Sequence, residues 1–364
     1  MKYLNKVYID GFMLGIVACA GLASVCPAQG AMAEAVDRGT KIAIALLFLL
    51  YGARLEPREA IAGLRHWRLH AAVLGMTFLV FPLIGLGLRV LVPAVLTDNL
   101  YVGVLFLCLV PSTVQSSIAF TVIARGNVAG AVVSASLSNL VGVFATPLLV
   151  VLLLNTTGKA EVKPSTVLVI MVQLLLPFLL GQLLRPRLGW LLRRPMPLKV
   201  VDRGSVFLVV YAAFSAGMAE HIWSGVSPGR VFATAAVCAG LLMAVLGITA
   251  GVGKAVGFSM PDRIVLVFCG SKKSLATGLP MASVLFAGQP VGLIVLPLMI
   301  FHQIQLITCA VLAQRYARKL PAEAVMWTPS SPTSGQSRPA ASTVAGPSEP
   351  ARPRSAARLS RPRG

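Results

Sequence analysis

Two adjacent lysines, Lys272 and Lys273, lie inside an apolar run, Ile264–Ala287, that is long enough to cross a membrane as a helix. A charged side chain at the bilayer centre costs about 2.5–3.5 kcal/mol on insertion scales, unless it faces a protein interior or a water-filled cavity. Gly270 and Ser274 flank the pair and suit a helix that stops and restarts. We therefore expect a broken helix that carries charge into the interior of a membrane protein.

The composition supports a membrane protein with several helical spans. Of the 364 residues, 56% are hydrophobic and 12% are charged, whereas soluble domains carry about 25% charged residues. The apolar residues form ten segments: about 7–27, 40–53, 71–91, 99–124, 128–154, 165–184, 204–223, 231–252, 262–287 and 291–314. The fold class that we predict is an all-α polytopic membrane protein with ten transmembrane helices.

A second segment also carries a polar interruption. The fourth segment breaks at Pro111–Ser117, as the ninth does at Cys269–Ser274. Each is the fourth of five segments, and an odd number of spans per half inverts the second half relative to the first. Broken helices at corresponding places of two inverted halves indicate a secondary-transporter site. Ser117–Ala119 can be laid over Ser274–Ala276, a weak match that chance also explains.

The interruptions divide the chain into two predicted repeats and a tail. Repeat one covers about 7–154 and repeat two about 165–314, together forming a transporter domain over 1–319. Residues 320–364 are rich in Pro, Ser, Ala and Arg and lack the apolar content of a folded core. We expect them to form a disordered cytoplasmic tail.

The basic residues indicate orientation rather than nucleic-acid binding. The net charge is +20, but outside the tail Lys and Arg lie mostly in connections between apolar segments. One side of the predicted topology holds fifteen of them and the other six, which places both termini in the cytoplasm. No cysteine or histidine shows metal-ligand spacing, and no nucleophile elbow, P-loop or carboxylate pair is present. We expect neither an enzyme nor a resident cofactor.

Several stretches carry a resemblance to a known family. They are LLFLLYGARL (Leu46–Leu55), HWRLH (His66–His70), VPSTVQSSIAFTVIARGNVAGAVVSAS (Val110–Ser136), GSKKSLATGLPMA (Gly270–Ala282) and LPLMIFHQIQL (Leu296–Leu306). From about residue 5 to 318 the chain resembles the bile acid:sodium symporter superfamily, in particular its sodium/bile acid cotransporter 7-like branch and the bacterial members of that branch.

The resemblance implies two inverted five-helix repeats. Crossing discontinuous helices four and nine belong to a core domain, and helices one, two, six and seven form a panel domain that moves against it. It also implies an integral protein of the bacterial inner membrane and transport by alternating access.

The resemblance also implies ion ligands, with one departure. The sodium-binding residues of helix four correspond to positions near Ser116 and Ser117, and Asn139 lies close to the ligand positions of helix five. The resemblance therefore allows a weak sodium site near these three residues. The acidic ligand of helix nine has no counterpart, because Cys269–Ser274 contains two lysines and no carboxylate. An ammonium of the pair could neutralise the carbonyl ends of both broken helices, which a sodium ion does in related transporters.

The leading hypothesis is a secondary transporter for a small organic anion, with sodium or protons as the coupling ion. An alternative is a non-transporting membrane regulator that acts through a partner protein. The expected partners are the anion and the lipid bilayer, not nucleic acid. The predicted substrate and ion pathway consists of Ser112, Thr113, Gln115, Ser116, Ser117, Ser134, Ser138, Asn139, Ser271, Lys272, Lys273, Ser274 and Gln303.

Overall fold

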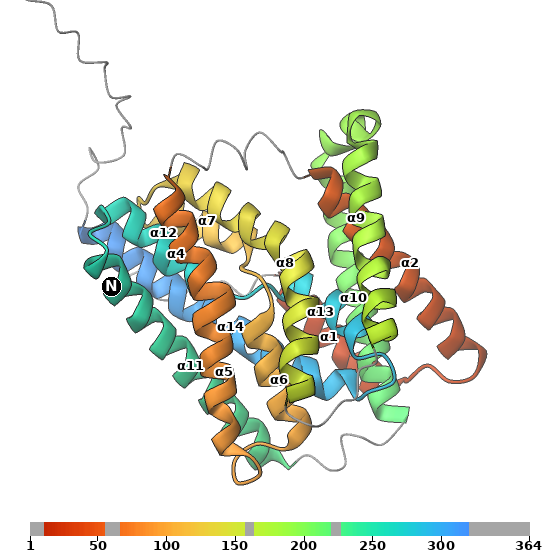
Figure 1. Cartoon of the computed structure of the whole chain (residues 1–364). Helices are drawn as coiled ribbons and strands as arrows, with labels where there is room; N and C mark the ends of the chain where they lie inside the picture. Colours follow the sequence, from red (N-terminus) through yellow and green to blue (C-terminus); the bar gives the residue numbers. More distant parts are fainter. Residues whose placement is uncertain (1–10, 55–65, 157–163, 220–226, 320–364) are drawn as a thin grey trace, which may run out of the picture. The chain divides into compact units, whose positions relative to one another are not determined.

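The computed structural model describes residues 11–54, 66–156, 164–219 and 227–319, and every regular element in these ranges is helical (Figure 1). The elements are α1 (Gly11–Val25), α2 (Ala31–Arg54), α4 (Trp67–Gly75), η2 (Met76–Val80), α5 (Phe81–Gly87), η3 (Leu88–Leu91), α6 (Asp98–Leu109), α7 (Val114–Ile123), α8 (Val128–Thr156), α9 (Pro164–Leu192), α10 (Pro195–Ala219), α11 (Pro228–Ala255), α12 (Met260–Gly270), α13 (Leu275–Leu285) and α14 (Val291–Lys319).

Each of the ten apolar segments coincides with a helix or a consecutive set of helices. Within the described ranges, five helical stretches are long and apolar enough to cross a membrane, and a sixth is counted if the bent pair α6–α7 forms one span. The protein is therefore a helical membrane protein with several spans, and the total of ten stays a prediction. Helix α2 begins at Ala31, earlier than the predicted start at 40. The tail at 320–364 lies outside the described residues.

The third apolar segment is one span, Trp67–Leu91, with a π-helical turn in its middle. In this turn the N–H of Phe81 bonds to the carbonyl of Met76, five residues earlier. The same register would pair the carbonyl of Thr77 with the N–H of residue 82, but residue 82 is a proline and has no N–H. The carbonyl of Thr77 is therefore free for another donor.

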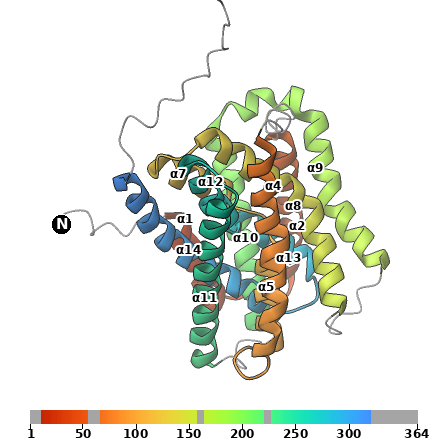
Figure 2. The ribbon, with the colours of Figure 1, turned by 60° about the vertical axis from the view of Figure 1, so that its left-hand side comes forward.

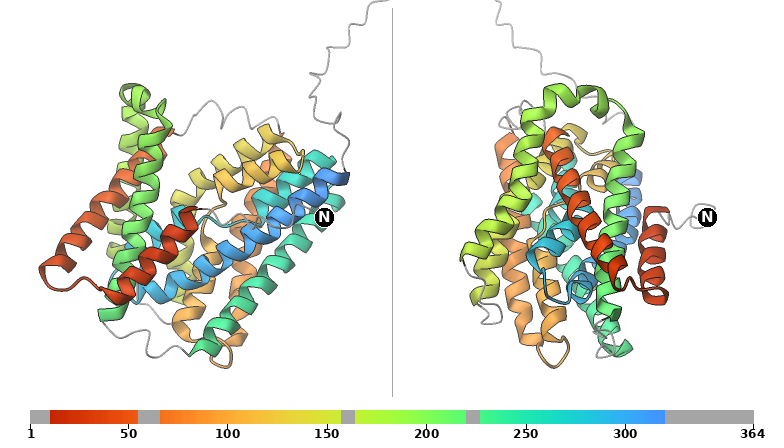
Figure 3. Two further views of the ribbon diagram at one scale, coloured as in Figure 1. Left: turned by 180° about the vertical axis from the view of Figure 1, so that it is seen from behind. Right: turned by 90° about the vertical axis from the view of Figure 1, so that its right-hand side faces the viewer.

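Helices α1, α2, α9 and α10 pack mainly on one another. Helix α2 runs along α9 and α10, and α1 lies on α10 (Figures 1 and 3). The backbones of α2 and α9 touch, because a Cβ atom added at Gly52 would overlap the carbonyl of Phe178, and one added at Gly181 would overlap the carbonyl of Leu49. Small residues of this kind let membrane helices approach closely.

The remaining helices form a second set around the two interrupted segments. Helix α14 packs on α6 and α11, α7 packs on α8 and α12, and α12 also contacts α4, α8 and α11 (Figure 2). Phe106 from α6 and Phe286, which follows α13, meet edge to face with ring centroids 5.2 Å apart. Most of the side chains buried in this set are apolar, and Lys272 and Lys273 at the second break are buried with them.

The α2–α9 contact leads to a stability prediction. Gly52→Ala should lower stability by about 1–3 kcal/mol, because a methyl group cannot fit against a backbone carbonyl without displacing one helix. Gly240→Ala is the matched control, since nothing lies within 4 Å of a Cβ at that position in α11. Thermal unfolding of the purified variants in detergent measures both effects. Equal melting temperatures for the two variants would show that the close contact does not matter.

Candidate functional site

Both predicted helix breaks are present and touch each other. Helix α6 ends at Leu109 and α7 begins at Val114 after a bend of 61°. Helix α12 ends at Gly270 and α13 begins at Leu275. The N–H of Ser274 donates to the carbonyl of Pro111 at 2.8 Å, which ties the two breaks together directly.

The two interrupted segments correspond to each other through their helix starts. Thr113 is the N-cap of α7 and Ser274 is the N-cap of α13. The residue that corresponds to Lys273 is therefore Ser112. The match of Ser117 with Ser274 is wrong by this criterion, because Ser117 lies inside α7, one turn beyond its first residue.

The ammonium group of Lys273 closes the carbonyl end of α6. The side chain is fully buried, and Nζ donates to the carbonyls of Thr77 at 3.0 Å, Cys108 at 2.9 Å and Val110 at 2.9 Å. Two of these acceptors lie at the C-terminus of α6, where the helix dipole is negative, and the third is the carbonyl that Pro82 leaves free. The ring of Phe81 lies 4.0 Å from Nζ and adds a cation–π contact.

The main chain of Lys273 is clamped from α14. Its N–H donates to Oε1 of Gln305 at 2.9 Å, and its carbonyl accepts from Nε2 of the same amide at 2.9 Å. Thr113 Oγ1 donates to that carbonyl as well, at 2.8 Å, and His302 Nδ1 lies 3.4 Å from it. The glutamine that reaches the break is thus Gln305, whereas the predicted pathway residue Gln303 is half-buried elsewhere on α14.

Lys272 has very different surroundings. It is also fully buried, yet its Nζ has no hydrogen-bond partner among the described residues. The group lies 3.7 Å from the ring centroid of Phe120 in α7 and 5.8 Å from that of Phe268 in α12. A desolvated cation over aromatic faces gains about 2 kcal/mol, which does not replace the hydration that burial removes.

A hydrogen-bonded chain of polar side chains links α8 to the start of α13. Asn139 donates to the carbonyl of Ser112 at 2.8 Å and accepts from Thr277 Oγ1 at 3.1 Å. Ser274 Oγ donates to Thr277 Oγ1 at 2.9 Å and accepts from the N–H of Thr277. The hydroxyl of Tyr51, from α2, lies 3.5 Å from the carbonyl of Ala276.

Thr277 and Tyr51 were not predicted as site residues. Thr277 lies three residues after the N-cap Ser274, a spacing that places it at the helix start. Tyr51 comes from the first half of the chain, and nothing in the local pattern indicates its partner. This polar chain contains three of the predicted residues, Ser112, Asn139 and Ser274.

Of the other predicted residues, Ser138 also contacts the first break, and the rest make separate contacts. Ser117 donates to the carbonyl of Phe268, Ser134 bonds to His70, Ser138 accepts from the N–H of Ser112, and Ser271 donates to the carbonyl of Val267. Gln115 is exposed.

The suggested sodium ligands do not share one hydrogen-bond network. Ser117 faces α12, Asn139 faces the break and Ser116 Oγ has no partner among the described residues. Sodium binding at these residues stays a prediction.

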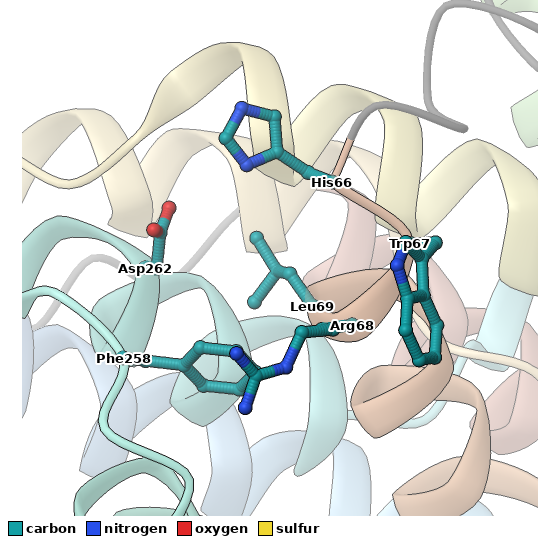
Figure 4. Close-up of a pocket in the computed structure, with 6 residues that line it drawn as sticks. All are labelled: His66, Trp67, Arg68, Leu69, Phe258 and Asp262. Carbon is teal, nitrogen blue, oxygen red and sulfur yellow. The ribbon is translucent and has the colours of Figure 1, made fainter.

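A pocket lies away from the breaks, where the start of α4 meets the loop before α12 (Figure 4). Its lining includes Trp67, Arg68, Phe258 and Asp262. It contains none of the predicted pathway residues. In the part of the chain that the structure describes, no three His, Cys, Asp or Glu residues are grouped as metal ligands.

These features define a class of protein: helical membrane proteins in which two interrupted helices meet inside the molecule. A family model described as the SBF-like CPA transporter family matches residues 10–318. The chain belongs to this family of bile acid:sodium symporter-like transporters.

The chain is similar to several curated proteins over nearly their whole length. "Uncharacterized protein PA2026" of Pseudomonas aeruginosa is 50% identical over 85% of this chain and 93% of its own length. "Putative symporter YfeH" of Escherichia coli is 46% identical over 85% of this chain and 94% of its own length. Rat "Sodium/bile acid cotransporter 7" is 28% identical over 86% of this chain and 94% of its own length. The family supports a transporter role.

The contacts of Lys273 predict a large effect of its removal. Lys273→Met keeps an apolar chain of similar length but leaves three buried carbonyls without their donor. Each such acceptor costs about 1–3 kcal/mol, so the variant should unfold at a clearly lower temperature. Lys254→Met is the matched control, because Lys254 is exposed near the end of α11. Thermal unfolding in detergent gives the comparison, and a Lys273→Met protein as stable as the control would contradict the assigned role.

Proposed function

We propose that this protein is a secondary active transporter that moves a small organic anion across the bacterial inner membrane by alternating access. The observation that carries the proposal is the buried ammonium of Lys273 at the junction of two broken helices. Many secondary transporters form their binding sites near the bilayer midplane from discontinuous helices. The family match supports the same role. We propose a carrier and not an enzyme.

The proposed architecture has ten transmembrane helices in two inverted five-helix repeats. Helices α1, α2, α9 and α10 form the panel, which the close α2–α9 contact supports. The remaining helices form the core, with the interrupted segments α6–α7 and α12–α13 crossing at its centre. The transporter domain covers 1–319, residues 320–364 are a cytoplasmic tail, and both termini face the cytoplasm.

Lys273 supplies the positive charge that this core needs. In the proposed mechanism its ammonium takes the place of a bound cation at the carbonyl end of α6. Nitrogen–oxygen distances of 2.9–3.0 Å to three carbonyls are good hydrogen bonds. Because this cation is covalently attached, it stays in place throughout the cycle, and its role is to hold the site together.

The substrate site that we propose lies at the start of α13, between panel and core. The first N–H groups of a helix have no partner within it, so they attract an anion. Ser274, Thr277 and Asn139 line this place from the core and Tyr51 from the panel. In this proposal a carboxylate or sulfonate on a compact organic body accepts from these hydroxyl and amide donors in place of their present partners. The whole predicted pathway set, from Ser112 to Gln303, remains part of this proposal.

Reconstituted protein tests the function. Organic anions that include taurocholate, benzoate and acetate are screened for thermal stabilisation of the purified protein. Each is tested with sodium and with potassium as the salt cation. Hits are then tested as radiolabelled substrates in proteoliposomes. We expect stabilisation and uptake by at least one anion, reduced several-fold by Asn139→Leu. If no organic anion stabilises the protein or accumulates, the regulator hypothesis gains and the transporter proposal fails.

The cation-replacement role of Lys273 predicts chemical rescue. Lys273→Ala leaves a space bounded by three carbonyls and the ring of Phe81, which suits a small alkylammonium ion. Methylammonium or ethylammonium should therefore raise the melting temperature of Lys273→Ala and leave that of the wild type unchanged. Tetramethylammonium, which has no N–H donor, is the control ion. Equal responses of wild type and variant would argue against a cation cradle at this place.

A further inference from the structure

We propose that Lys272 is the proton-carrying residue of the transport cycle, binding a proton on its amine when the anion binds and releasing the proton when the anion leaves. The proposal rests on the proposed function, because it names the coupling ion of that transporter. Its starting point is the contrast between two neighbouring lysines. Lys273 has three acceptors for its three ammonium hydrogens, whereas Lys272 has none among the described residues.

The chamber around Lys272 consists mainly of aromatic rings, and none of the described groups hydrogen-bonds to Nζ. Phe120 from α7 and Phe268 from α12 lie against Nζ, and Tyr316 from α14 meets Phe268 edge to face at 6.2 Å. Ser116, one turn before Phe120 on the same face of α7, has a buried hydroxyl that is also without a partner in the described ranges. An ammonium in this chamber has no described group that accepts its hydrogen bonds.

The titratable groups on the helices that pack around α12 give no counter-charge either. Helices α7 and α8 contain none. The others are Arg68 and His70 on α4; Arg230, Cys238 and Lys254 on α11; Asp262, Arg263 and Cys269 on α12; and His302, Cys309, Arg315, Tyr316, Arg318 and Lys319 on α14.

The one described carboxylate in that set, Asp262, lies at the start of α12. Its two oxygens accept from Asn127 and Ser259 at 2.8 and 2.9 Å. His70 bonds to Ser134, and His302 bonds to Gln305. The hydrogen-bond partners of these three groups therefore do not include Lys272. The titratable groups that lie near its amine are the thiols of Cys269 and Cys309, and a protonated thiol carries no charge. In the proposed cycle, the charge of the chamber changes when the amine of Lys272 gains or loses a proton.

Charge balance explains why such a residue suits an anion carrier. When no anion is bound, Lys272 is neutral, and the charge of Lys273 is compensated by the three carbonyls around it. When a monovalent anion enters, one proton moves from water to the amine, and the ammonium offsets the added charge. The loaded and empty forms then have the same net charge, so neither reorients an uncompensated charge through the low-dielectric interior.

Nuclear magnetic resonance tests the proton exchange directly and requires no substrate. Protein labelled with ¹³C at lysine Cε is titrated from acid to alkaline pH in detergent, and Lys272→Met identifies the Lys272 resonance by its loss. We expect the Lys272 Cε resonance to shift reversibly between its ammonium and amine positions, while that of Lys273 stays at its ammonium position over the same range. A Lys272 resonance fixed at the ammonium position at every pH would overturn the proposal.

Thermal unfolding over the same pH range supplies a second measurement. The wild type should lose melting temperature relative to Lys272→Met as the pH falls through the range in which the resonance shifts, since the ammonium formed there has no acceptor. Parallel curves for the two proteins would also overturn the proposal. Lys272→Gln serves in place of Lys272→Met if the methionine variant does not fold.

The titration separates this inference from the proposed function. An anion taken up by a protein whose Lys272 does not titrate would leave the transporter standing and remove the proton role. With the anion found in the uptake screen, a pH gradient should drive its accumulation by the wild type, and Lys272→Met should lose that dependence while still exchanging the anion. Accumulation by Lys272→Met that follows the pH gradient as the wild type does would refute the coupling.

Discussion

The burial of one ammonium among three carbonyls governs the interior of this protein. Lys273 joins the end of α6, the π-helical turn of the preceding span and, through Gln305, helix α14. Without this donor, the carbonyls at the interrupted helix would have no hydrogen-bond partner, because no water reaches the hydrocarbon region of a membrane to replace it. The three carbonyls compensate the buried charge of Lys273. The ammonium in turn supplies the hydrogen bonds that these buried carbonyls would otherwise lack.

Two neighbouring residues of one type thus have opposite environments. The backbone between α12 and α13 directs Lys273 toward α6 and Lys272 toward Phe120 in α7. One amine is bound by dipoles that compensate its charge, and the other lies among rings that compensate it only weakly. This difference in surroundings is the basis for the roles that we propose: Lys273 holds the two breaks together, and Lys272 carries a proton.

Much of the fold was readable from the sequence, because membrane spans must be apolar over a fixed length. The positions of the ten segments and of both breaks follow from that constraint and from the lysine pair. The register between the breaks did not follow, since Ser-hydrophobic-Ala triplets recur while N-caps are defined by backbone geometry. Gln305 and Gln303 were not distinguished either, because both follow His302 in a short polar stretch and only helix rotation separates them. Tyr51 and Thr77 come from distant segments, and long-range contacts leave no local pattern.

The π-helical turn at Met76–Val80 limits how the molecule can move. Its liberated carbonyl binds the same ammonium as the end of α6, so the span that contains α4 and α5 is pinned to both interrupted helices at one atom. Moving one of these three stretches away from the others would break a hydrogen bond to the ammonium. In the alternating-access cycle that we propose, the moving boundary is the contact of α2 and α10 with α13, where the hydroxyl of Tyr51 lies 3.5 Å from the carbonyl of Ala276.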